Sequence, residues 1–364
     1  MAHTRVLIID DSALIREVLT QILQDDPDIT VVGTARDPIA ALPKIAALRP
    51  DVLTLDVEMP RQDGLSFLEE LMRDNPMPVV MVSGLTQRGC ETTLRALELG
   101  AFDFVEKPKL DVATGTFALA GELVAKVKAA AASRRRPHVP APAPATATRG
   151  DDANRVRMQP TIGRLRVAAV ALENTQVVIA LGASTGGTEA LREVLCELPP
   201  DCPPVVVVQH MPPMFTKAFA ARLNTLCQLS IKEAVDGDRA VRGTVLIAPG
   251  DFHMTLARSG SGYVVRLDQE PRLHNCRPAV DRLFDSVASV VGRNAVAGIM
   301  TGMGGDGAKG LLAIRQAGGQ TLAQNEATCV VFGMPAVAIR LGAAERVVPL
   351  RDIATALMGF VRAR

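Results

Sequence analysis

The 364-residue sequence has few aromatic side chains: no tryptophan, one tyrosine and ten phenylalanines. Aromatic rings provide the surfaces on which unpaired bases stack and the belts that hold membrane proteins at the lipid interface, so neither role is indicated. Net charge is equally small, because 40 Lys and Arg residues against 39 Asp and Glu residues leave +1 at pH 7. Without a basic field to attract phosphates, nucleic acid is not a predicted partner.

Long apolar runs and paired cysteines are also missing. No uninterrupted apolar stretch approaches the roughly 18 residues that a membrane-spanning helix needs. Asp10 and Asp11 interrupt the N-terminal segment before the apolar core of a signal peptide could form. The six cysteines contain no C-x-x-C pair and no cluster with histidine at zinc spacing, which is typical of free thiols in a reducing compartment. We therefore expect a soluble, cytoplasmic protein without direct membrane insertion.

Short apolar runs alternate with helical patterns along most of the chain, which predicts an α/β fold. Near-continuous Val, Ile and Leu runs indicate strands covered on both faces, hence two doubly wound parallel sheets. The expected strands are Val6–Asp10, Ile29–Ala35, Val52–Asp56, Val79–Ser83, Phe102–Glu106, Val177–Ala183, Val205–His210, Val245–Pro249 and Ala295–Met300. We also expect His253–Arg258 and Tyr263–Asp268 to form a β-hairpin that gives the second sheet an antiparallel edge.

One Pro- and Ala-rich segment, residues 129–150, lacks apolar periodicity and cannot form a core. We therefore divide the chain into an N-terminal domain of residues 4–124, a linker of residues 125–175 and a C-terminal domain of residues 176–364.

Acidic and polar residues follow the expected strands of the N-terminal domain: Asp10, Asp11, Asp56, Ser83 and Lys107. Parallel strands bring these residues to one rim of the sheet. Any one of the aspartates could simply cap a helix, but together they form a cluster of carboxylates that repel one another unless a hard cation such as Mg²⁺ lies among them. With the charge neutralised, Asp56 can act as nucleophile on a phosphoryl group, whose oxygens then contact the metal, Ser83 and Lys107.

Residues 4–124 closely resemble the two-component receiver domain. The motifs that carry the resemblance are Asp10-Asp11, Asp56-x-x-Met59-Pro60-x-x-Asp63-Gly64, Ser83 and Lys107-Pro108. The resemblance implies a flavodoxin-like fold and phosphorylation of Asp56 by a histidine kinase. It also implies Mg²⁺ held by Asp11, Asp56 and the carbonyl of Glu58, with Asp10 assisting and Lys107 as the cationic partner of the phosphate. Phe104 occupies the position of an aromatic switch residue, although it has no hydroxyl group.

Ser184 lies in a glycine-rich turn between an expected strand and helix, with the sequence Leu181-Gly182-Ala183-Ser184-Thr185-Gly186-Gly187. Such a turn can hold a pyrophosphate, but the spacing is not G-x-G-x-x-G and the next strand ends in Gln209-His210 rather than an acidic residue. Alternatively, the glycines expose Ser184 at a helix N-terminus, where backbone N–H groups stabilise a developing oxyanion. We favour this second interpretation.

A nucleophilic serine needs a base, and two further segments supply candidates at the same rim. His210 ends the neighbouring strand, and Asp306 lies in a glycine-rich loop after the strand Ala295–Met300. Each of the three residues could instead serve as a cap or a structural polar group. Jointly they predict a Ser-His-Asp triad, which is defined by geometry and role rather than by chain order.

The C-terminal segments resemble the chemotaxis protein-glutamate methylesterase, or CheB, family. The matching motifs are Gly182-Ala183-Ser184-Thr185-Gly186-Gly187, Gln209-His210-Met211-Pro212 and Thr301-Gly302-Met303-Gly304-Gly305-Asp306-Gly307. The resemblance implies hydrolysis of γ-glutamyl methyl esters on chemoreceptor cytoplasmic helices, with release of methanol, and deamidation of receptor glutamines. It makes Ser184 the nucleophile, His210 the general base and acid, Asp306 its orienting partner, and Thr185 and Met303 candidates for oxyanion support. No cofactor is implied in this esterase site.

Two residues near the expected cleft call for comment. Ala279 stands where the family pattern leads us to expect serine, and Cys276 has no histidine placed for it by spacing, so we expect an ordinary thiol.

The whole sequence leaves three functional hypotheses: an esterase gated by phosphorylation of a receiver that covers the Ser184 cleft, a phosphate sink or adaptor with an idle C-terminal domain, and a DNA-binding response regulator. The intact triad argues against the second, and the missing helix-turn-helix argues against the third.

Overall fold

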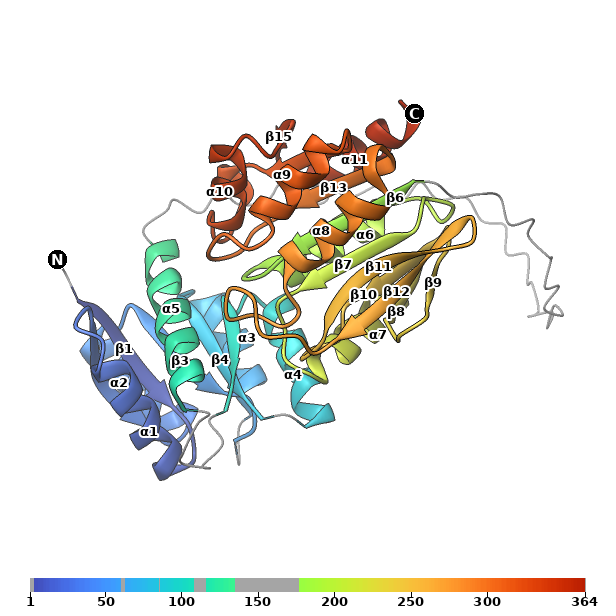
Figure 1. The fold of residues 1–364 in the computed structure, drawn as a ribbon. Coiled ribbons are helices and arrows are strands. Elements are labelled where there is room, and N and C mark those ends of the chain that lie inside the picture. Colours follow the sequence, from blue (N-terminus) through green and yellow to red (C-terminus); the bar gives the residue numbers. More distant parts are fainter. Residues whose placement is uncertain (1–2, 60–62, 85, 108–115, 135–176, 364) are drawn as a thin grey trace, which may run out of the picture.

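The computed structural model describes residues 3–59, 63–84, 86–107, 116–134 and 177–363. In the N-terminal domain, strands and helices alternate regularly (Figure 1). Their bounds are β1 Thr4–Ile9, α1 Ala13–Gln24, β2 Ile29–Ala35, α2 Pro38–Leu48, β3 Val52–Asp56, α3 Gly64–Asp74, β4 Val79–Ser83, α4 Gln87–Glu98, β5 Asp103–Glu106 and α5 Thr116–Arg134.

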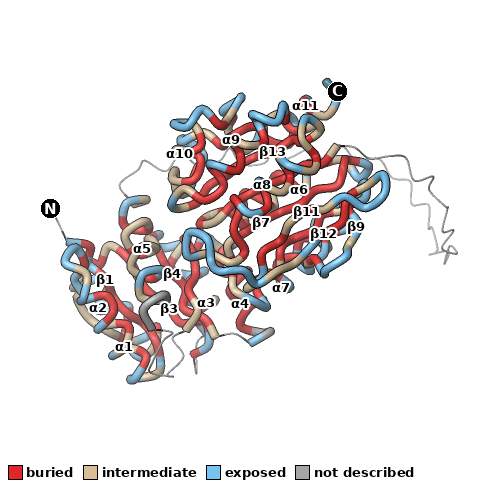
Figure 2. The backbone as a smooth tube through the Cα atoms, in the orientation of Figure 1, coloured by how far each residue is buried: buried red, intermediate tan, exposed pale blue. Residues whose placement is uncertain are grey.

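These five strands form one parallel sheet in the order β2-β1-β3-β4-β5. Every residue of β3 and β4 is buried, as expected for strands covered by helices on both faces. Figure 2 shows this burial along the central strands of both domains. Because all five strands run in the same direction, their carboxyl ends lie at one edge, where Asp56 and Ser83 are the last residues of β3 and β4.

The helix α5 reaches Arg134, so it contains residues 125–134 of the expected linker. The rest of that segment, up to residue 175, lies outside the described residues, as does Pro108.

The C-terminal domain repeats the alternation with more elements. Their bounds are β6 Val178–Ala183, α6 Gly187–Glu197, β7 Val205–Gln209, α7 Phe215–Leu226, β8 Ser230–Glu233, β9 Arg239–Ala240, β10 Thr244–Ile247, β11 His253–Ser259, β12 Gly262–Asp268, α8 Val280–Val290, β13 Ala295–Ile299, α9 Ala308–Gln316, β14 Gln320–Gln324, α10 Met334–Arg340, β15 Arg346–Val348 and α11 Ile353–Arg362. Three short 3₁₀ helices cover Gly292–Asn294, Glu326–Thr328 and Leu350–Asp352.

Seven of these strands form a parallel sheet in the order β15-β14-β13-β6-β7-β10-β8, which confirms the predicted fold class. The hairpin β11–β12 is also present, but it does not form an edge of this sheet. It pairs with β9 in a separate three-stranded antiparallel sheet. The edge is taken by β8, which pairs with β10 in parallel, and the hairpin instead contributes Met254, Leu256 and Val265 to an apolar cluster with α8.

The two domains are in direct contact. The ring of Phe104 on β5 stacks on the ring of Phe215 at the start of α7, with 4.3 Å between centroids. Both rings belong to one cluster of buried apolar side chains that includes residues of both domains, so the two cores are continuous here. Beside them α4 packs against α6 and α7, and Figure 1 shows α4 next to α7. Arg222 on α7 makes two hydrogen bonds of 2.9 Å to the Glu98 carboxylate at the end of α4.

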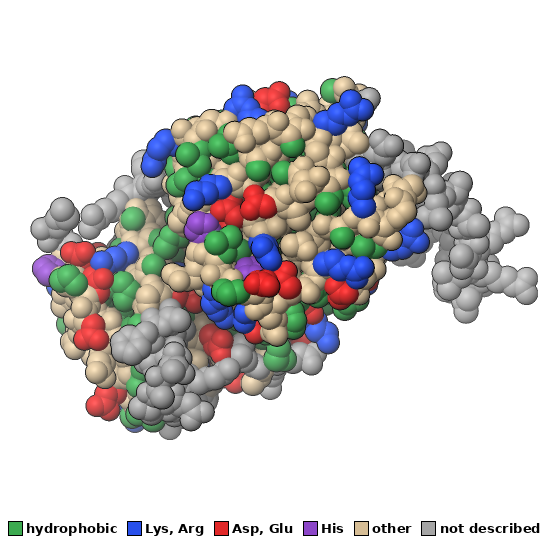
Figure 3. All heavy atoms as spheres, viewed as in Figure 1, with side chains coloured by type: hydrophobic (Ala, Val, Ile, Leu, Met, Phe, Trp, Pro, Cys, Tyr) green, Lys and Arg blue, Asp and Glu red, His purple; other side chains and the backbone are tan. Residues whose placement is uncertain are grey.

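Within the described part of the chain, no helix is both long and apolar enough to cross a membrane. Lys and Arg side chains are interspersed with Asp and Glu side chains on the face shown in Figure 3. This mixture agrees with the near-zero net charge.

Candidate functional site

Ser184 lies in the tight turn between β6 and α6, where it is partly exposed. Its carbonyl oxygen accepts a 2.7 Å hydrogen bond from the N–H of Gly187, and its own N–H donates to the carbonyl of Thr301 at 3.0 Å. Gly186 has φ of 74°, a conformation that costs other residues energy. The glycines therefore serve the turn that presents Ser184 at the N-terminus of α6.

The loop after β13 approaches Ser184 closely. A Cβ atom on Gly302 would lie 2.8 Å from the Cβ of Ser184, so this position accommodates glycine alone. The same loop is held from the other side, because the N–H of Gly302 donates to the carbonyl of Val331 at 3.0 Å. The glycine-rich loop that also carries Asp306 therefore packs directly against Ser184, which agrees with its expected place at the same rim.

His210 follows β7 at the level of Ser184. In the pairing of β6 with β7, Ala183 is opposite Gln209, and both candidate residues come next in their strands. The N–H of His210 donates to the carbonyl of Ala183 at 3.2 Å, and the buried amide of Gln209 donates to the carbonyls of Ser184 at 2.9 Å and His210 at 3.3 Å. Gln209 thus links the two turns, a positioning contact that spacing alone did not reveal.

Asp306 pairs directly with His210. Its Oδ2 lies 2.8 Å from His210 Nε2, and its two oxygens accept hydrogen bonds from the N–H groups of Val280 at 2.7 Å and Asp281 at 2.9 Å. These N–H groups belong to the first turn of α8, where a negative charge is stabilised. Burial acts to raise the pKa of Asp306, but His210 and these backbone groups outweigh it and hold the pKa below its ordinary value.

Cys276 is placed differently from the prediction. Its sulfur lies 3.6 Å from His210 Nδ1, the ring nitrogen that does not face Asp306. Sequence spacing could not show this, because 66 residues separate the two and the segment before α8 is irregular, with positive φ at His274 and Asn275. Burial acts to lower the pKa of His210, but attraction to the Cys276 sulfur and the bond to Asp306 outweigh it and raise the pKa to about 10.

A second imidazole joins this network through a buried carboxylate. His274 Nε2 lies 2.9 Å from Asp281 Oδ2, and the other oxygen of Asp281 accepts the N–H of Gly310 at 2.8 Å.

The two oxyanion candidates also lie near the serine turn. Thr185 is buried, and its carbonyl accepts the hydroxyl of Thr301 at 2.9 Å, whereas Met303 is partly exposed. Their predicted role is not tested by these contacts.

The N-terminal pocket contains two buried carboxylates, Asp10 and Asp56. Lys107 Nζ lies 2.7 Å from Asp56 Oδ2 and 3.4 Å from Asp10 Oδ2. Burial is the main cause that raises the pKa of Asp56 to about 6, and the nearby charge of Asp10 adds to it while Lys107 opposes it. The remaining predicted residues are adjacent: Ser83 is buried at the end of β4, and the N–H of Glu58 donates to Asp56 Oδ1 at 3.2 Å.

This pocket fits a divalent cation. Carboxylate oxygens of Asp10, Asp11 and Asp56 all lie within 4.8 Å of one another. Asp10 Oδ2 is buried with no hydrogen bond and only the 3.4 Å ion pair with Lys107, whose single charge does not balance the carboxylates around it. An oxygen-preferring ion such as Mg²⁺ would satisfy both needs.

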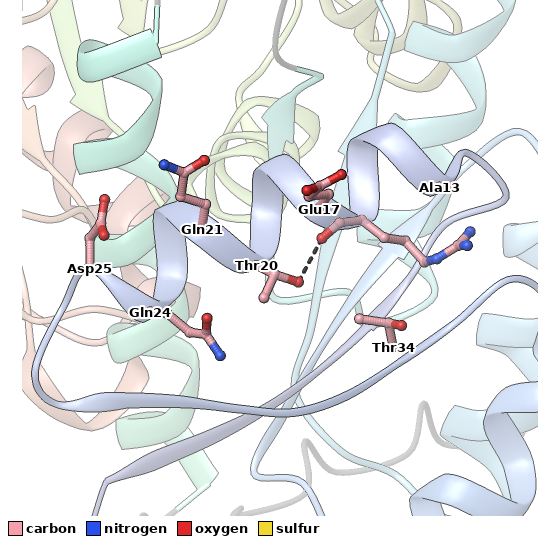
Figure 4. Close-up of a pocket in the computed structure, with 8 residues that line it drawn as sticks. Ala13, Glu17, Thr20, Gln21, Gln24, Asp25 and Thr34 are labelled. Atoms are coloured by element: carbon pink, nitrogen blue, oxygen red, sulfur yellow. Dashed lines mark hydrogen bonds between the residues drawn. The ribbon is translucent and has the colours of Figure 1, made fainter.

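A separate hollow of about 530 Å³ runs along α1, and Figure 4 shows its lining. The residues around it are mostly polar, including Arg16, Glu17, Gln21 and Gln24. Arg16 donates to the carbonyl oxygens of Asp10 at 2.7 Å and Asp11 at 3.0 Å, so this surface adjoins the backbone that carries the acidic pocket.

Comparison with known proteins gives matches over nearly the whole chain. Residues 179–357 match the family described as CheB methylesterase, and residues 6–113 match the response regulator receiver domain. The Pseudomonas aeruginosa protein-glutamate methylesterase/protein-glutamine glutaminase 2 is 54% identical over 97% of this chain and 95% of its own length. The Salmonella typhimurium protein-glutamate methylesterase/protein-glutamine glutaminase is 51% identical over 100% of this chain and 98% of its own. The crystal structure of the Thermotoga maritima CheB methylesterase catalytic domain matches with TM-score 0.49 and 42% identity, over 50% of this chain and 97% of that one.

Proposed function

This chain belongs to the CheB methylesterase family and carries a response regulator receiver domain, and we propose that it hydrolyses γ-glutamyl methyl esters on the cytoplasmic helices of chemoreceptors. The products are methanol and a free glutamate side chain, and deamidation of receptor glutamines is its second activity. The observation that supports this best is the convergence of Ser184, His210 and Asp306 at one rim of the seven-stranded sheet. We place this reaction in the cytoplasm. The direct test is an assay for methanol released from methylated receptor.

The geometry suits acyl transfer by the serine. His210 uses Nε2 to pair with Asp306, and we assign its Nδ1, which in this structure lies 3.6 Å from the Cys276 sulfur, to take the proton from Ser184 once the substrate is bound. The Ser184 oxygen attacks the ester carbonyl, methanol leaves with the proton that His210 returns, and water then hydrolyses the acyl-enzyme by the same route. Asp306 stabilises the imidazolium that forms in each step. The N-terminus of α6, with Thr185 and Met303, surrounds the developing oxyanion.

Residues 4–124 then act as the regulatory receiver, together with the end of α5 up to Arg134, whose Val127 and Ala130 are buried in the receiver core. The rest of the expected linker, residues 135–175, joins it to the catalytic domain of residues 176–364. A histidine kinase supplies the phosphoryl group to Asp56, with Asp10, Asp11, Asp56 and the carbonyl of Glu58 holding Mg²⁺ and with Ser83 and Lys107 contacting the phosphate. Bound Mg²⁺ would supply charge neutralisation for the incoming phosphoryl group. Lys107, which already binds Asp56 at 2.7 Å, would move its charge to the phosphate oxygens.

The contact between the domains supports gating by this event. Phe104 lies on β5, the strand next to β4, and β4 ends at Ser83. Its ring stacks on Phe215, the first residue of the helix that follows His210. Val331, whose carbonyl holds the Gly302 loop against Ser184, packs against the apolar core of the receiver. The receiver therefore contacts Phe215, at the start of the helix after His210, and Val331, which binds the Gly302 loop, and we assign this docked arrangement to the restrained state.

We expect Asp56→Ala to abolish stimulation of methanol release by a small phosphodonor with Mg²⁺, because no acyl phosphate can form. The unstimulated rate should stay that of the wild type, since Asp56 lies in the other domain. Initial rates with and without phosphodonor measure both quantities. Stimulation that persists in Asp56→Ala would contradict phosphorylation at this residue.

The docking contact has its own charge-reversal test. Glu98→Arg places two cations together at the end of α4, so we expect the unstimulated rate to rise about 2- to 10-fold as docking weakens. Arg222→Glu should act in the same direction, and the double exchange should return the rate toward wild type. Equal rates in all four proteins would argue against steric restraint at this contact.

The pH dependence should reflect the environment of His210. The base must be neutral to accept a proton, and its raised pKa of about 10 keeps it protonated at lower pH, so kcat/KM should rise as pH increases. We expect the midpoint to lie above the ordinary imidazole value of about 6.5. Cys276→Ala removes one cause of the raised pKa of His210 and should move the midpoint of the pH profile to lower pH.

Two further variants serve as controls. Cys202→Ala, at the opposite end of β7, is the matched cysteine control, and Ser184→Ala corrects for spontaneous ester hydrolysis. A midpoint unmoved by Cys276→Ala would exclude this coupling.

A further inference from the structure

Two cysteines meet at the ends of neighbouring helices in the catalytic domain. Cys196 lies in the last turn of α6, and Cys227 follows the last residue of α7. Their sulfur atoms are 2.7 Å apart, and both residues are partly exposed. By contrast, Cys90, Cys202 and Cys329 are buried. This contact lies at the ends of α6 and α7 remote from Ser184 and His210, so the hydrolytic mechanism makes no use of it.

We propose that Cys196 and Cys227 form a reversible dithiol–disulfide pair that a hydroperoxide oxidises. A disulfide bond is about 2.05 Å long, so the two sulfurs need to approach by less than about 1 Å. The bond would link α6 to α7, the two helices that pack against α4 of the receiver. This inference does not depend on the proposed hydrolytic activity.

The surroundings assign a separate role to each sulfur. Arg192 lies one helical turn before Cys196 and is electrostatically attracted to the sulfurs of both cysteines. The attacking role falls to Cys196 because Cys227 is the sulfur that is held protonated. Burial and the neighbouring Cys196 raise the pKa of Cys227 to about 12, so Cys227 keeps its proton until it reacts. Glu189 and Glu98 also face Arg192, and Glu189 binds it at 2.8 Å.

The chemistry balances with hydrogen peroxide as the oxidant. The Cys196 thiolate attacks one peroxide oxygen, which gives a sulfenic acid and hydroxide, and the hydroxide takes up the proton that Cys196 released. The Cys227 sulfur then attacks the sulfenic sulfur, and the hydroxyl group leaves as water with the proton of Cys227. Two thiols are oxidised to one disulfide, and one peroxide is reduced to two waters.

Peptide mapping of the full-length protein tests the pair. After treatment with hydrogen peroxide, alkylation of free thiols and trypsin digestion, Cys196 and Cys202 fall in the same peptide, residues 193–217, and Cys227 falls in residues 223–232. The Cys202→Ala variant therefore makes the assignment unambiguous, and fragmentation between residues 197 and 201 makes it in the wild type. We expect a linkage of residues 193–217 to residues 223–232 that a thiol reductant removes.

Thermal unfolding supplies a second readout. A bond that closes this loop should raise the Tm by about 5–10 °C under oxidant, and the rise should vanish in Cys196→Ser and Cys227→Ser and persist in Cys202→Ala. Separate alkylation of both peptides after oxidation, a Cys196–Cys202 linkage, or a Tm rise that survives in the serine variants would overturn the proposal.

Discussion

Ser184→Ala should lower the rate of methanol release by about 10⁴- to 10⁶-fold, as removal of a triad nucleophile does in other serine hydrolases. Without the hydroxyl, no acyl-enzyme can form, while the turn that carries residue 184 is built from backbone contacts that alanine keeps. These are the Gly187 N–H to the carbonyl of residue 184 and the N–H of residue 184 to Thr301. The Tm should therefore remain that of the wild type.

A matched serine-to-alanine change separates this loss from a general effect. Ser230 lies exposed on β8, at the edge of the same sheet, and its substitution should leave both rate and Tm unchanged. Methanol release by Ser184→Ala at the wild-type rate would rule out the serine mechanism. It would then favour an adaptor whose C-terminal domain has no hydrolytic role.

The strands and the meeting of the site residues could be predicted from sequence because parallel sheets have a simple rule. Buried Val and Ile runs indicate strands, and residues just after them gather at one edge, as Asp56 and Ser83 do in one domain and Ser184 and His210 do in the other. Glycine-rich turns added the expectation that Asp306 lies at the same edge. Its 2.8 Å contact with His210 agrees with that expectation.

Contacts made by irregular segments could not be predicted in this way. The stretch between β12 and α8 has no periodicity that would place Cys276 beside His210 or the first turn of α8 on Asp306. The hairpin β11–β12 was expected from its turn residues, but no pattern in it specifies which sheet it joins. The pairing of Phe104 with Phe215 is equally hidden, because an interface phenylalanine and a core phenylalanine look alike in a sequence.

The second large effect is expected from Asp306→Asn, which should reduce kcat by about 10³- to 10⁴-fold with little change in KM. A neutral amide cannot stabilise the imidazolium of His210, so the pKa of His210 should also fall and the pH profile should shift to lower pH. Stability should change as well, because the carboxylate has a lowered pKa and accepts two N–H groups of α8. Its contribution is present above the ordinary aspartate value and is lost as pH falls through the lowered pKa.

The pH profile distinguishes catalysis from structure in this variant. Loss of folded protein alone would lower the apparent rate equally at every pH and leave the midpoint unmoved, whereas loss of the charge that faces His210 moves the midpoint. Asp352→Asn, an exposed change at the start of α11 where the side chain makes no capping hydrogen bond, controls for the substitution itself and should keep the wild-type rate and midpoint. A kcat within tenfold of the wild type for Asp306→Asn would mean that His210 does not need this partner, and the triad would reduce to a dyad.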